Sequence, residues 1–306
     1  MKVFVTGATG FVGNEVVRQL YNAGHAIRIL VRKKPSFRVE GPHGSMEAQI
    51  RVGDILDPAS LKDALKEIDA VIHLVGIISE VGASTFKNIH VQGAQNVVTA
   101  AKEQGVKRFV HMSALGSRPN AVSRYHRTKW EAEEIVRDSG LDFTIFRPSL
   151  IFGPRDHFVN LFAKIIRHSP IVPLLGRRDA KFQPVAVENV AAPIVKSLAE
   201  PKSLGQAYDL VGPETFTLCK IIDQIMEVMK YRRMKLHIPS FIVRIQAALL
   251  EFFFPNLLRQ PPPLNRDQLI MLQEDNVGNG QPANELFGLK PIPFKQGISR
   301  YLATGA

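Results

Sequence analysis

The chain has 306 residues, of which 45% are hydrophobic, and a formal net charge of +11. This length and apolar content suit one large α/β domain with a smaller lobe. The single cysteine, Cys219, excludes an intrachain disulfide and a cysteine-based metal centre. The basic charge favours phosphate-bearing ligands, anionic membrane surfaces or acidic partners. We expect no nucleic-acid partner, because zinc-finger spacing, an aromatic RNA-binding signature and a long basic run are all missing.

The first 32 residues carry the strongest pattern in the chain. Lys2–Thr6 is a short apolar run typical of a buried parallel strand, and it leads into glycines at 7, 10 and 13. Apolar residues at helical spacing then predict a helix over Asn14–Tyr21, and Ala26–Val31 predicts a second strand. Strand, glycine turn, helix and strand form the βαβ unit that holds a dinucleotide pyrophosphate.

Each glycine of this turn has a predicted physical role. Gly7 makes the tight turn after the strand, Gly10 lets phosphate oxygens approach the backbone, and Gly13 lets the helix pack close to the strand. The helix N-terminus then faces the phosphates with its free N–H groups. A plain strand–helix turn is the alternative. The predicted pyrophosphate contacts are Gly7, Thr9, Gly10, Phe11, Val12 and Gly13.

The end of the second strand predicts which coenzyme is bound. NAD-specific sites usually place Asp or Glu there, bonded to the ribose 2′-hydroxyl. This chain has Arg32-Lys33-Lys34 instead, with no acid before Glu40. Guanidinium and ammonium groups would bind a 2′-phosphate, so we expect NADP(H), with Arg32 as the main contact and Lys33 as the second. The alternative is a solvated basic loop.

The remaining pattern of the first half alternates strands and helices. Strands are predicted at 50–55, 70–76, 108–113 and 142–150, with helices at 57–65, 85–103 and 125–138 between them. Such alternation predicts an α/β fold with a doubly wound parallel sheet, the Rossmann type. Ligands bind such sheets at the carboxyl ends of the strands. That rim carries Gly7 to Gly13, Arg32, Asp54, Val75, Gly76, Ser113, Pro148 and Ser149.

The regular alternation ends after Gly153-Pro154. Helices are predicted at 158–167, 217–230 and 239–254, with short helices at 264–274 and 294–302, a strand and helix over 183–198 and a strand at 208–211. Pro170, Pro173 and Gly176 predict a loop after the first of these helices. We therefore expect a Rossmann domain made of residues 1–153 and 180–205. Residues 154–179 and 206–306 are expected to form a smaller mixed C-terminal lobe.

One helix carries the candidate chemistry. Tyr125 and Lys129 are four residues apart, so on the predicted helix they share one face. A nearby ammonium and an oxidised nicotinamide would favour the phenolate of Tyr125 and bring its pKa toward useful acid–base range. Lys129 could also bond the nicotinamide ribose, and Ser113, at a strand end, could orient a carbonyl or alcohol. The predicted reaction is hydride exchange between a secondary alcohol and a ketone.

Several motifs together resemble the short-chain dehydrogenase/reductase superfamily, in its extended or atypical branch. They are Thr6–Gly13, Gly53-Asp54, Asn88, Ser113, Tyr125–Lys129 and Arg147-Pro148-Ser149. The resemblance implies that Asp54 and Ile55 flank the adenine, that Val75 and Gly76 line the coenzyme, and that the segment from Pro148 and Ser149 to Ile151 passes the nicotinamide.

Within that superfamily the chain is most similar to the nucleotide-binding accessory subunit of respiratory complex I and its bacterial relatives. The segments SRYHRTKWEAEEIV, FRPSLIFGPRDHFVN and PPPLNRDQLIMLQEDNV carry this resemblance. In that group the bound NADP(H) is thought to be structural. Two departures from the extended enzymes stand out. Ser113 and Tyr125 lie unusually close in sequence, which shortens the loop that shapes the substrate pocket, and the basic cluster at Arg32 replaces the usual acid.

The segment 238–254 (IPSFIVRIQAALLEFFF) is apolar on nearly all faces. It is too short and too charged for a transmembrane span. Packing in the core or against a subunit is the leading interpretation. The alternative is an in-plane contact with a membrane, aided by nearby arginines and lysines.

Three functions follow from the sequence. The leading hypothesis is an NADP(H)-dependent oxidoreductase or epimerase-like enzyme acting on a carbonyl or alcohol. The rival is a non-catalytic, coenzyme-stabilised subunit or assembly factor of a membrane respiratory complex, and the third is a redox-sensing regulator. Because His90, His126 and His157 show no metal-ligand spacing with acids, no metal is expected. Met1 leads directly into the first strand, so we expect a cytoplasmic protein, at most peripheral to the inner face of the membrane.

Overall fold

The computed structural model describes residues 1–33, 40–41, 44–45, 48–238, 247, 251, 254, 262 and 264–303. The strands are β1 (Lys2–Thr6), β2 (Ala26–Val31), β3 (Glu40–Gly41), β4 (Gly44–Ser45), β5 (Gln49–Val52), β6 (Ala70–His73), β7 (Arg108–Met112), β8 (Asp142–Pro148), β9 (Ile151–Phe152), β10 (Ile171–Leu174), β11 (Lys181–Phe182), β12 (Val185–Ala186), β13 (Gln206–Leu210), β14 (Phe216–Thr217) and β15 (Met234–His237).

The helices of the same residues are α1 (Phe11–Asn22), α2 (Pro58–Ala64), α3 (Gly93–Glu103), α4 (Arg124–Arg137), α5 (Phe158–His168), α6 (Val187–Lys196), α7 (Leu218–Met229), α9 (Arg266–Met271), α10 (Gln281–Phe287) and α11 (Phe294–Leu302). A π-helical segment, Lys87–Gln92, precedes α3 directly, and 3-10 turns lie at Ser197–Ala199 and Pro201–Ser203. The long helix predicted over 85–103 therefore divides into two segments.

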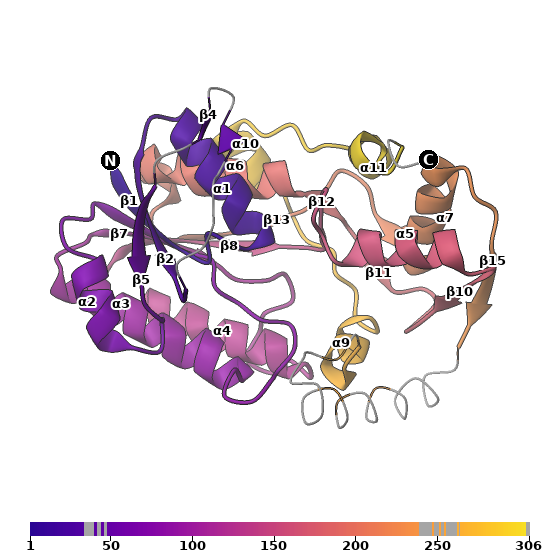
Figure 1. Cartoon of the computed structure of the whole chain (residues 1–306), viewed down its shortest axis with the longest axis horizontal. Coiled ribbons are helices and arrows are strands. Elements are labelled where there is room, and N and C mark those ends of the chain that lie inside the picture. The colour runs from indigo at the N-terminus through magenta and orange to yellow at the C-terminus, as the bar shows by residue number, and fades with distance from the viewer. Residues whose placement is uncertain are drawn as a thin grey trace.

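The main sheet has seven strands in the order β13-β8-β7-β6-β1-β2-β5, and every neighbouring pair in it is parallel. Helices α1, α6 and α10 lie on one face and α2, α3 and α4 on the other (Figure 1). Because side chains alternate along a strand, Val3 and Val5 pack on the first face while Phe4 packs on the second. The predicted doubly wound α/β fold is confirmed.

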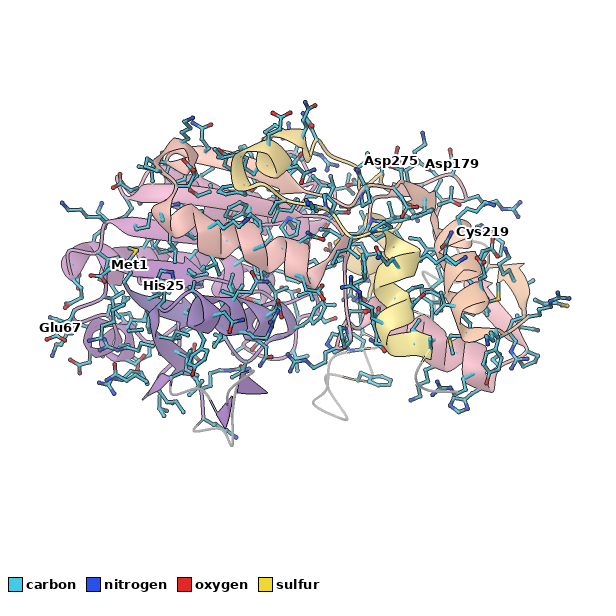
Figure 2. All side chains as sticks on the ribbon, turned by 90° about the horizontal axis from the view of Figure 1, so that it is seen from above. Met1, His25, Glu67, Asp179, Cys219 and Asp275 are labelled. Atoms are coloured by element: carbon cyan, nitrogen blue, oxygen red, sulfur yellow. The ribbon has the colours of Figure 1, made fainter. Side chains whose placement is uncertain are left out.

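A smaller lobe follows the Rossmann sheet (Figure 1). Its apolar core joins α5, α7 and α11, with Val159, Ile222 and Ile298 all fully buried. In Figure 2, Asp179, Asp275 and Cys219 are labelled at this lobe, whereas Met1, His25 and Glu67 lie at the opposite end of the molecule. Arg177 bridges Asp179 and Asp275, which ties the late part of the chain to the lobe.

The structure corrects two expectations and leaves a third untested. The sequence assigns residues 206–306 to the smaller lobe. Strand β13, at the start of this range, instead pairs with β8 in the main sheet. The stretch around Pro173, predicted as a loop, is the strand β10, which pairs with β15. The helix predicted over 239–254 lies almost wholly outside the described residues. Among the helices of the described part, none is long and apolar enough to cross a membrane.

Candidate functional site

The predicted site residues gather along one edge of the main sheet. Strand register aligns the carboxyl ends, since Thr6 pairs with both Leu30 and His73, His73 pairs with His111, and Met112 pairs with Phe146. The residues that follow these ends therefore share the edge at which ligands bind parallel sheets. They are Gly7, Arg32, Asp54, Val75, Gly76, Ser113 and Ser149.

The glycine turn between β1 and α1 has the geometry of a phosphate cradle. Gly7 has a left-handed φ of +76°, and the Gly10 N–H donates to the Gly7 carbonyl at 3.0 Å. A Cβ at position 13 would lie 2.1 Å from the Gly7 oxygen, so the helix approaches the turn too closely for any side chain. No side chain caps the N-terminus of α1. Its free N–H groups and dipole therefore suit an anionic ligand.

The cradle is enclosed by apolar packing. Val12 is buried in the main core, while the Phe11 ring lies 3.0 Å from the position a Cβ on Gly153 would take. Thr9 is exposed at the turn. A pyrophosphate would therefore meet backbone N–H groups and Thr9 on one side and a fixed apolar wall on the other.

The adenosine side of the edge presents cations. Arg32 and Lys33 are both exposed directly after β2. Asp54, beyond β5, uses one carboxylate oxygen to accept the Leu56 N–H at 2.9 Å. Ile55 is buried, in contact with Gly93 of α3. The predicted adenosine residues thus lie on the neighbouring ends of β2 and β5.

The part of the edge predicted to face the nicotinamide is formed by the ends of β6 and β8. Val75 is half-buried and Gly76 exposed, and a Cβ on Gly76 would lie 3.6 Å from His90 Nε2 and 3.9 Å from Lys129 Nζ. Pro148 and Ser149 are buried, and Ile151 begins β9. Ser149 donates its hydroxyl to the Asn276 carbonyl at 3.2 Å, so the late part of the chain fixes this segment.

Helix α4 is anchored to the sheet by buried polar contacts. Lys129 is 3% exposed and donates its ammonium to the Met112 carbonyl at 2.6 Å. One turn further, fully buried Glu133 accepts from Arg147 of β8 at 2.8 Å. These contacts fix the helix face that carries Tyr125 and Lys129.

Burial lowers the pKa of Lys129 to about 8, and the nearby carboxylate of Glu133 opposes this shift only in part. The histidines around it, His73, His90 and His111, are all buried, and burial lowers each of their pKa values. These imidazoles are therefore neutral, and they add no positive charge beside Lys129.

Replacing Lys129 with Met should change how stability depends on pH. The folded pKa lies below the ordinary 10.5, so protonation of Lys129 disfavours the folded state increasingly as pH falls from 10.5 to 8. Between about pH 7.5 and 9.5, wild type should gain about 2 kcal/mol of unfolding free energy relative to Lys129→Met. Denaturant titrations of the ligand-free proteins measure this. The same substitution at Lys102, which is exposed, should show no such trend. If the unfolding free energies of wild type and Lys129→Met changed in parallel with pH, the prediction would be contradicted.

Tyr125 lies in surroundings that favour its protonated form. The ring packs edge-on against His90 and Phe86, with centroids 5.3 and 6.0 Å away. Burial, followed by the carboxylate of Asp267, raises the pKa of Tyr125 to about 12. The phenol is therefore protonated at neutral pH in the ligand-free protein. The predicted phenolate depends also on the positive charge of an oxidised nicotinamide, and it stays a prediction. The ammonium of Lys129 donates to the Met112 carbonyl.

His90 is a site residue that the sequence did not single out. Its Nε2 accepts the Ile77 N–H at 3.1 Å, so the ring proton lies on Nδ1 and is donated to Thr128 Oγ1 at 2.9 Å. Thr128 in turn donates to the Tyr125 carbonyl. His90 thus joins the loop after β6 to the turn that carries Tyr125. Helical spacing alone does not distinguish such a residue from a core histidine.

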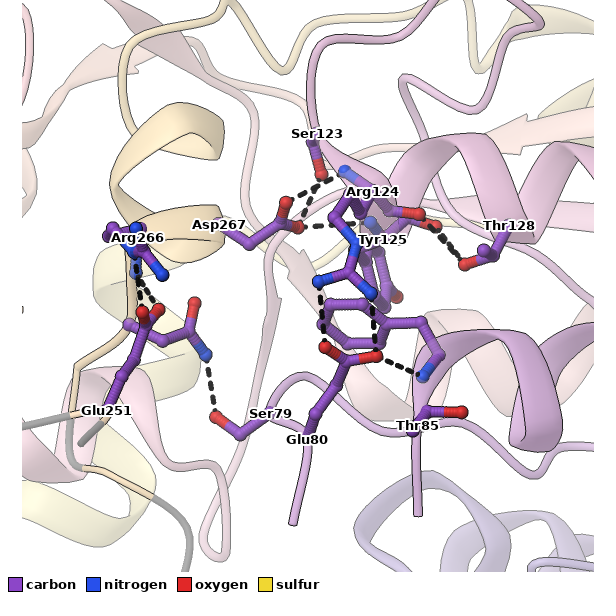
Figure 3. Close-up of polar contacts among 12 residues, drawn as sticks. Ser79, Glu80, Thr85, Ser123, Arg124, Tyr125, Thr128, Glu251, Arg266 and Asp267 are labelled. Atoms are coloured by element: carbon purple, nitrogen blue, oxygen red, sulfur yellow. Dashed lines mark hydrogen bonds and ion pairs between the residues drawn. The ribbon is translucent and has the colours of Figure 1, made fainter. Parts of the chain in front are cut away.

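The start of α4 is held by a distant acid, Asp267 of α9. Its carboxylate accepts from the Ser123 hydroxyl and from the backbone N–H groups of Arg124 and Tyr125, at 2.7–3.0 Å (Figure 3). Carboxylates stabilise helix N-termini in this way. Nearby, the Asn265 amide bonds the loop at Ile78 and Ser79. Helix α9 therefore fixes two borders of the site.

Two other predicted residues have structural partners. Ser113 is buried at the end of β7 and donates to Ser117 Oγ at 3.2 Å. Asn88 is exposed and bonds the Ala83 carbonyl. No cluster of potential metal ligands occurs among the residues that the structure describes.

The parallel sheet, the glycine cradle and the Tyr125–Lys129 helix define a dinucleotide-binding protein of the short-chain dehydrogenase/reductase type. The chain belongs to the NAD(P)H-binding family, whose model matches residues 7–164. The predicted superfamily and the binding of a pyridine nucleotide are thereby confirmed.

The relatives include a mitochondrial NADH dehydrogenase (ubiquinone) 1 alpha subcomplex subunit 9 from Arabidopsis thaliana. It is 30% identical over 280 residues, which cover 89% of this chain and 70% of the relative. A ceramide reductase from Caulobacter vibrioides is 31% identical over 65% of this chain and 61% of its own length. The predicted similarity to the complex I accessory subunit and bacterial relatives is confirmed.

Among solved structures, UDP-glucose 4-epimerase of Thermotoga maritima superposes with a TM-score of 0.76. The match covers 99% of each chain at 18% sequence identity. At this identity the similarity establishes the fold alone.

Proposed function

We propose that the protein is an NADPH-dependent reductase of a carbonyl substrate. The observation that carries the proposal is the face of α4, where buried Lys129 and the raised pKa of Tyr125 adjoin the nicotinamide edge. When bound, the coenzyme supplies the hydride. Tyr125, protonated at neutral pH, would donate the proton to the carbonyl oxygen, and the Ser113 hydroxyl would orient that oxygen. Lys129 would hold the coenzyme ribose beside them.

The choice of NADPH over NADH rests on the end of β2. Arg32 and Lys33 are exposed there, and no carboxylate lies among the described residues that directly follow the strand. The 2′-phosphate would bond Arg32 in the first place and Lys33 in the second. A carboxylate at this position would repel the phosphate.

Arg32→Asp should therefore weaken NADPH far more than NADH. Loss of a charge-assisted bond to the phosphate predicts about a 30-fold rise in the NADPH dissociation constant, with NADH altered about threefold or less. Fluorescence titration measures both. Lys107→Asp makes the same charge change at an exposed position just before β7. This position lies at the amino end of the strand, away from the coenzyme edge, so both affinities should be unchanged. Equal weakening of the two coenzymes by Arg32→Asp would refute the role of Arg32.

Charges near Tyr125 favour an uncharged substrate over a nucleotide sugar. Arg124 pairs with Glu80 at 3.0 Å, and Arg118 pairs with Glu274 at 2.8 Å. The other charged side chain beside Tyr125 is the carboxylate of Asp267, which would repel a phosphate. A diphosphate would meet cations that carboxylates already neutralise. Two aliphatic side chains, Ile78 and Val122, are exposed beside this network.

The proposal is tested by NADPH oxidation with purified protein against a panel of ketones, quinones and UDP-glucose. Turnover with an uncharged carbonyl compound supports it. Tight NADPH retention without turnover on any member of the panel would favour the second candidate function instead.

That second candidate is a coenzyme-stabilised subunit or assembly factor of a membrane respiratory complex. It is favoured by the similarity to the Arabidopsis relative, a subunit of mitochondrial NADH dehydrogenase. The short connection between Ser113 and Tyr125 also supports it, because little chain is left to shape a pocket. In either case we propose a cytoplasmic protein peripheral to the inner face of the membrane. The segment 238–254, for which a membrane contact is the alternative to packing in the core or against a subunit, lies largely outside the described residues.

A further inference from the structure

The outer face of the β10–β15 pair is apolar and exposed, and no described residue covers it. In this parallel pair Ile171 lies opposite Met234, and Pro173 lies opposite Leu236. Side chains alternate along each strand and register partners share a side. Val172 is fully buried and Lys235 bonds Asp223 of α7, so these two residues mark the inner face.

The residues of the opposite, outer face are strongly exposed. Met234 is 70% exposed, Leu236 53% and Ile171 39%. Met234 is the most exposed large apolar residue of the described chain. Adjacent protruding apolar side chains of this kind mark an interaction surface more often than isolated ones do.

Cations border this face. Lys230 and Arg232 are exposed on the segment that leads into β15, and Lys164 is exposed on α5. The end of α5 lies beside the start of β15, since Arg233 Nε donates to the Ile166 carbonyl at 2.7 Å and the Met234 N–H donates to the Pro170 carbonyl at 3.0 Å.

The acids of the neighbouring helix do not offset these cations. On α7, Asp223 pairs with Lys235 and Glu227 pairs with Lys295. Figure 1 places β10 and β15 at the end of the smaller lobe, away from the Rossmann sheet. The face therefore combines protruding apolar side chains, a cationic border and a location remote from the candidate active site.

We propose that this face docks on an anionic phospholipid bilayer. Ile171, Met234 and Leu236 would enter the boundary between headgroups and acyl chains, where apolar side chains leave water. Lys230 and Arg232 would meet the lipid phosphates. A second copy fits less well, because a symmetric contact would bring the same cations together. Docking leaves the coenzyme edge free, so this proposal does not depend on the proposed reductase activity.

Cosedimentation of the full chain with vesicles tests the proposal. Vesicles of phosphatidylglycerol and phosphatidylcholine should bind the protein, and vesicles of phosphatidylcholine alone should bind it at least about fivefold more weakly. Met234→Glu with Leu236→Glu should lower the partition coefficient at least about tenfold. Lys230→Gln with Arg232→Gln should lower it about 20-fold at low salt and much less at high salt, because salt screens the attraction.

Leu204→Glu is the matched control. It adds a carboxylate at another exposed leucine, remote in sequence from β10 and β15, and should leave binding unchanged. Retained NADPH binding verifies that each variant is folded. The proposal is overturned if wild type does not cosediment with anionic vesicles, or if both double variants bind the vesicles as tightly as wild type does. It is also overturned if the Met234/Leu236 variant only converts a dimer to a monomer by size-exclusion chromatography with light scattering.

Discussion

Tyr125→Phe should lower turnover about 100-fold or more while leaving NADPH binding unchanged. The phenol is the proposed proton donor, and removal of a positioned general acid typically costs about 10²–10⁴ in rate. The ring itself should stay in place, because it is held by packing on Phe86 and His90 and by the backbone bond to Asp267. Among the described residues, its hydroxyl has no hydrogen-bond partner that the variant would lose.

The measurement is NADPH oxidation against the best substrate of the carbonyl panel, with the coenzyme dissociation constant measured in parallel. Tyr301→Phe provides a control with the same chemical change at a hydroxyl that bonds Asp156 in the smaller lobe. It should leave turnover per folded molecule unchanged. Turnover equal to wild type in Tyr125→Phe would remove this residue from the mechanism.

Gly13→Ala should abolish coenzyme binding and destabilise the fold. The new methyl group would lie 2.1 Å from the Gly7 oxygen and 2.8 Å from the Ala8 Cα, both of them backbone atoms with no room to move. Relief requires α1 to shift away from β1, at a cost of about 3 kcal/mol or more. Because the same shift displaces the N–H groups that face the phosphates, we expect at least about a 100-fold weaker NADPH affinity.

Gly24→Ala tests whether the effect is specific to the turn. Gly24 follows the other end of α1, where an added methyl group meets no atom within 4 Å. Its φ of +74° still predicts a loss of about 1 kcal/mol from backbone strain. Coenzyme affinity should be unchanged in this variant. If Gly13→Ala bound NADPH as tightly as Gly24→Ala, the turn would not be the phosphate site.

The Rossmann sheet was predictable because its signals are local. Each central strand is a short apolar run, and the glycine turn marks both the end of β1 and the start of α1. The smaller lobe was less predictable. Pro173 lies inside β10 and reads as a loop residue, yet the strand forms through pairing with β15, some sixty residues later. The membership of β13 in the main sheet likewise depends on pairing with β8.

The site was predictable as a set of residue types but not as an electrostatic environment. The spacing of Tyr125 and Lys129 places them on one helix face. The pKa of Tyr125, however, depends first on burial and then on Asp267, which lies 142 residues further along the chain. The neutrality of His90 depends first on its burial and then on the charge of Lys129, which lies on another helix. Such contacts arise only when the chain folds, so no local pattern in the sequence predicts their effect on a pKa.

The central claim is that the glycine turn holds the pyrophosphate while Arg32 and Lys33 select the 2′-phosphate. Calorimetry of NADPH and NADH binding to the purified, ligand-free protein tests it most directly. The account predicts measurable heat with both coenzymes and an affinity for NADPH at least about tenfold higher. Absence of heat with either coenzyme, or tighter binding of NADH, would contradict it.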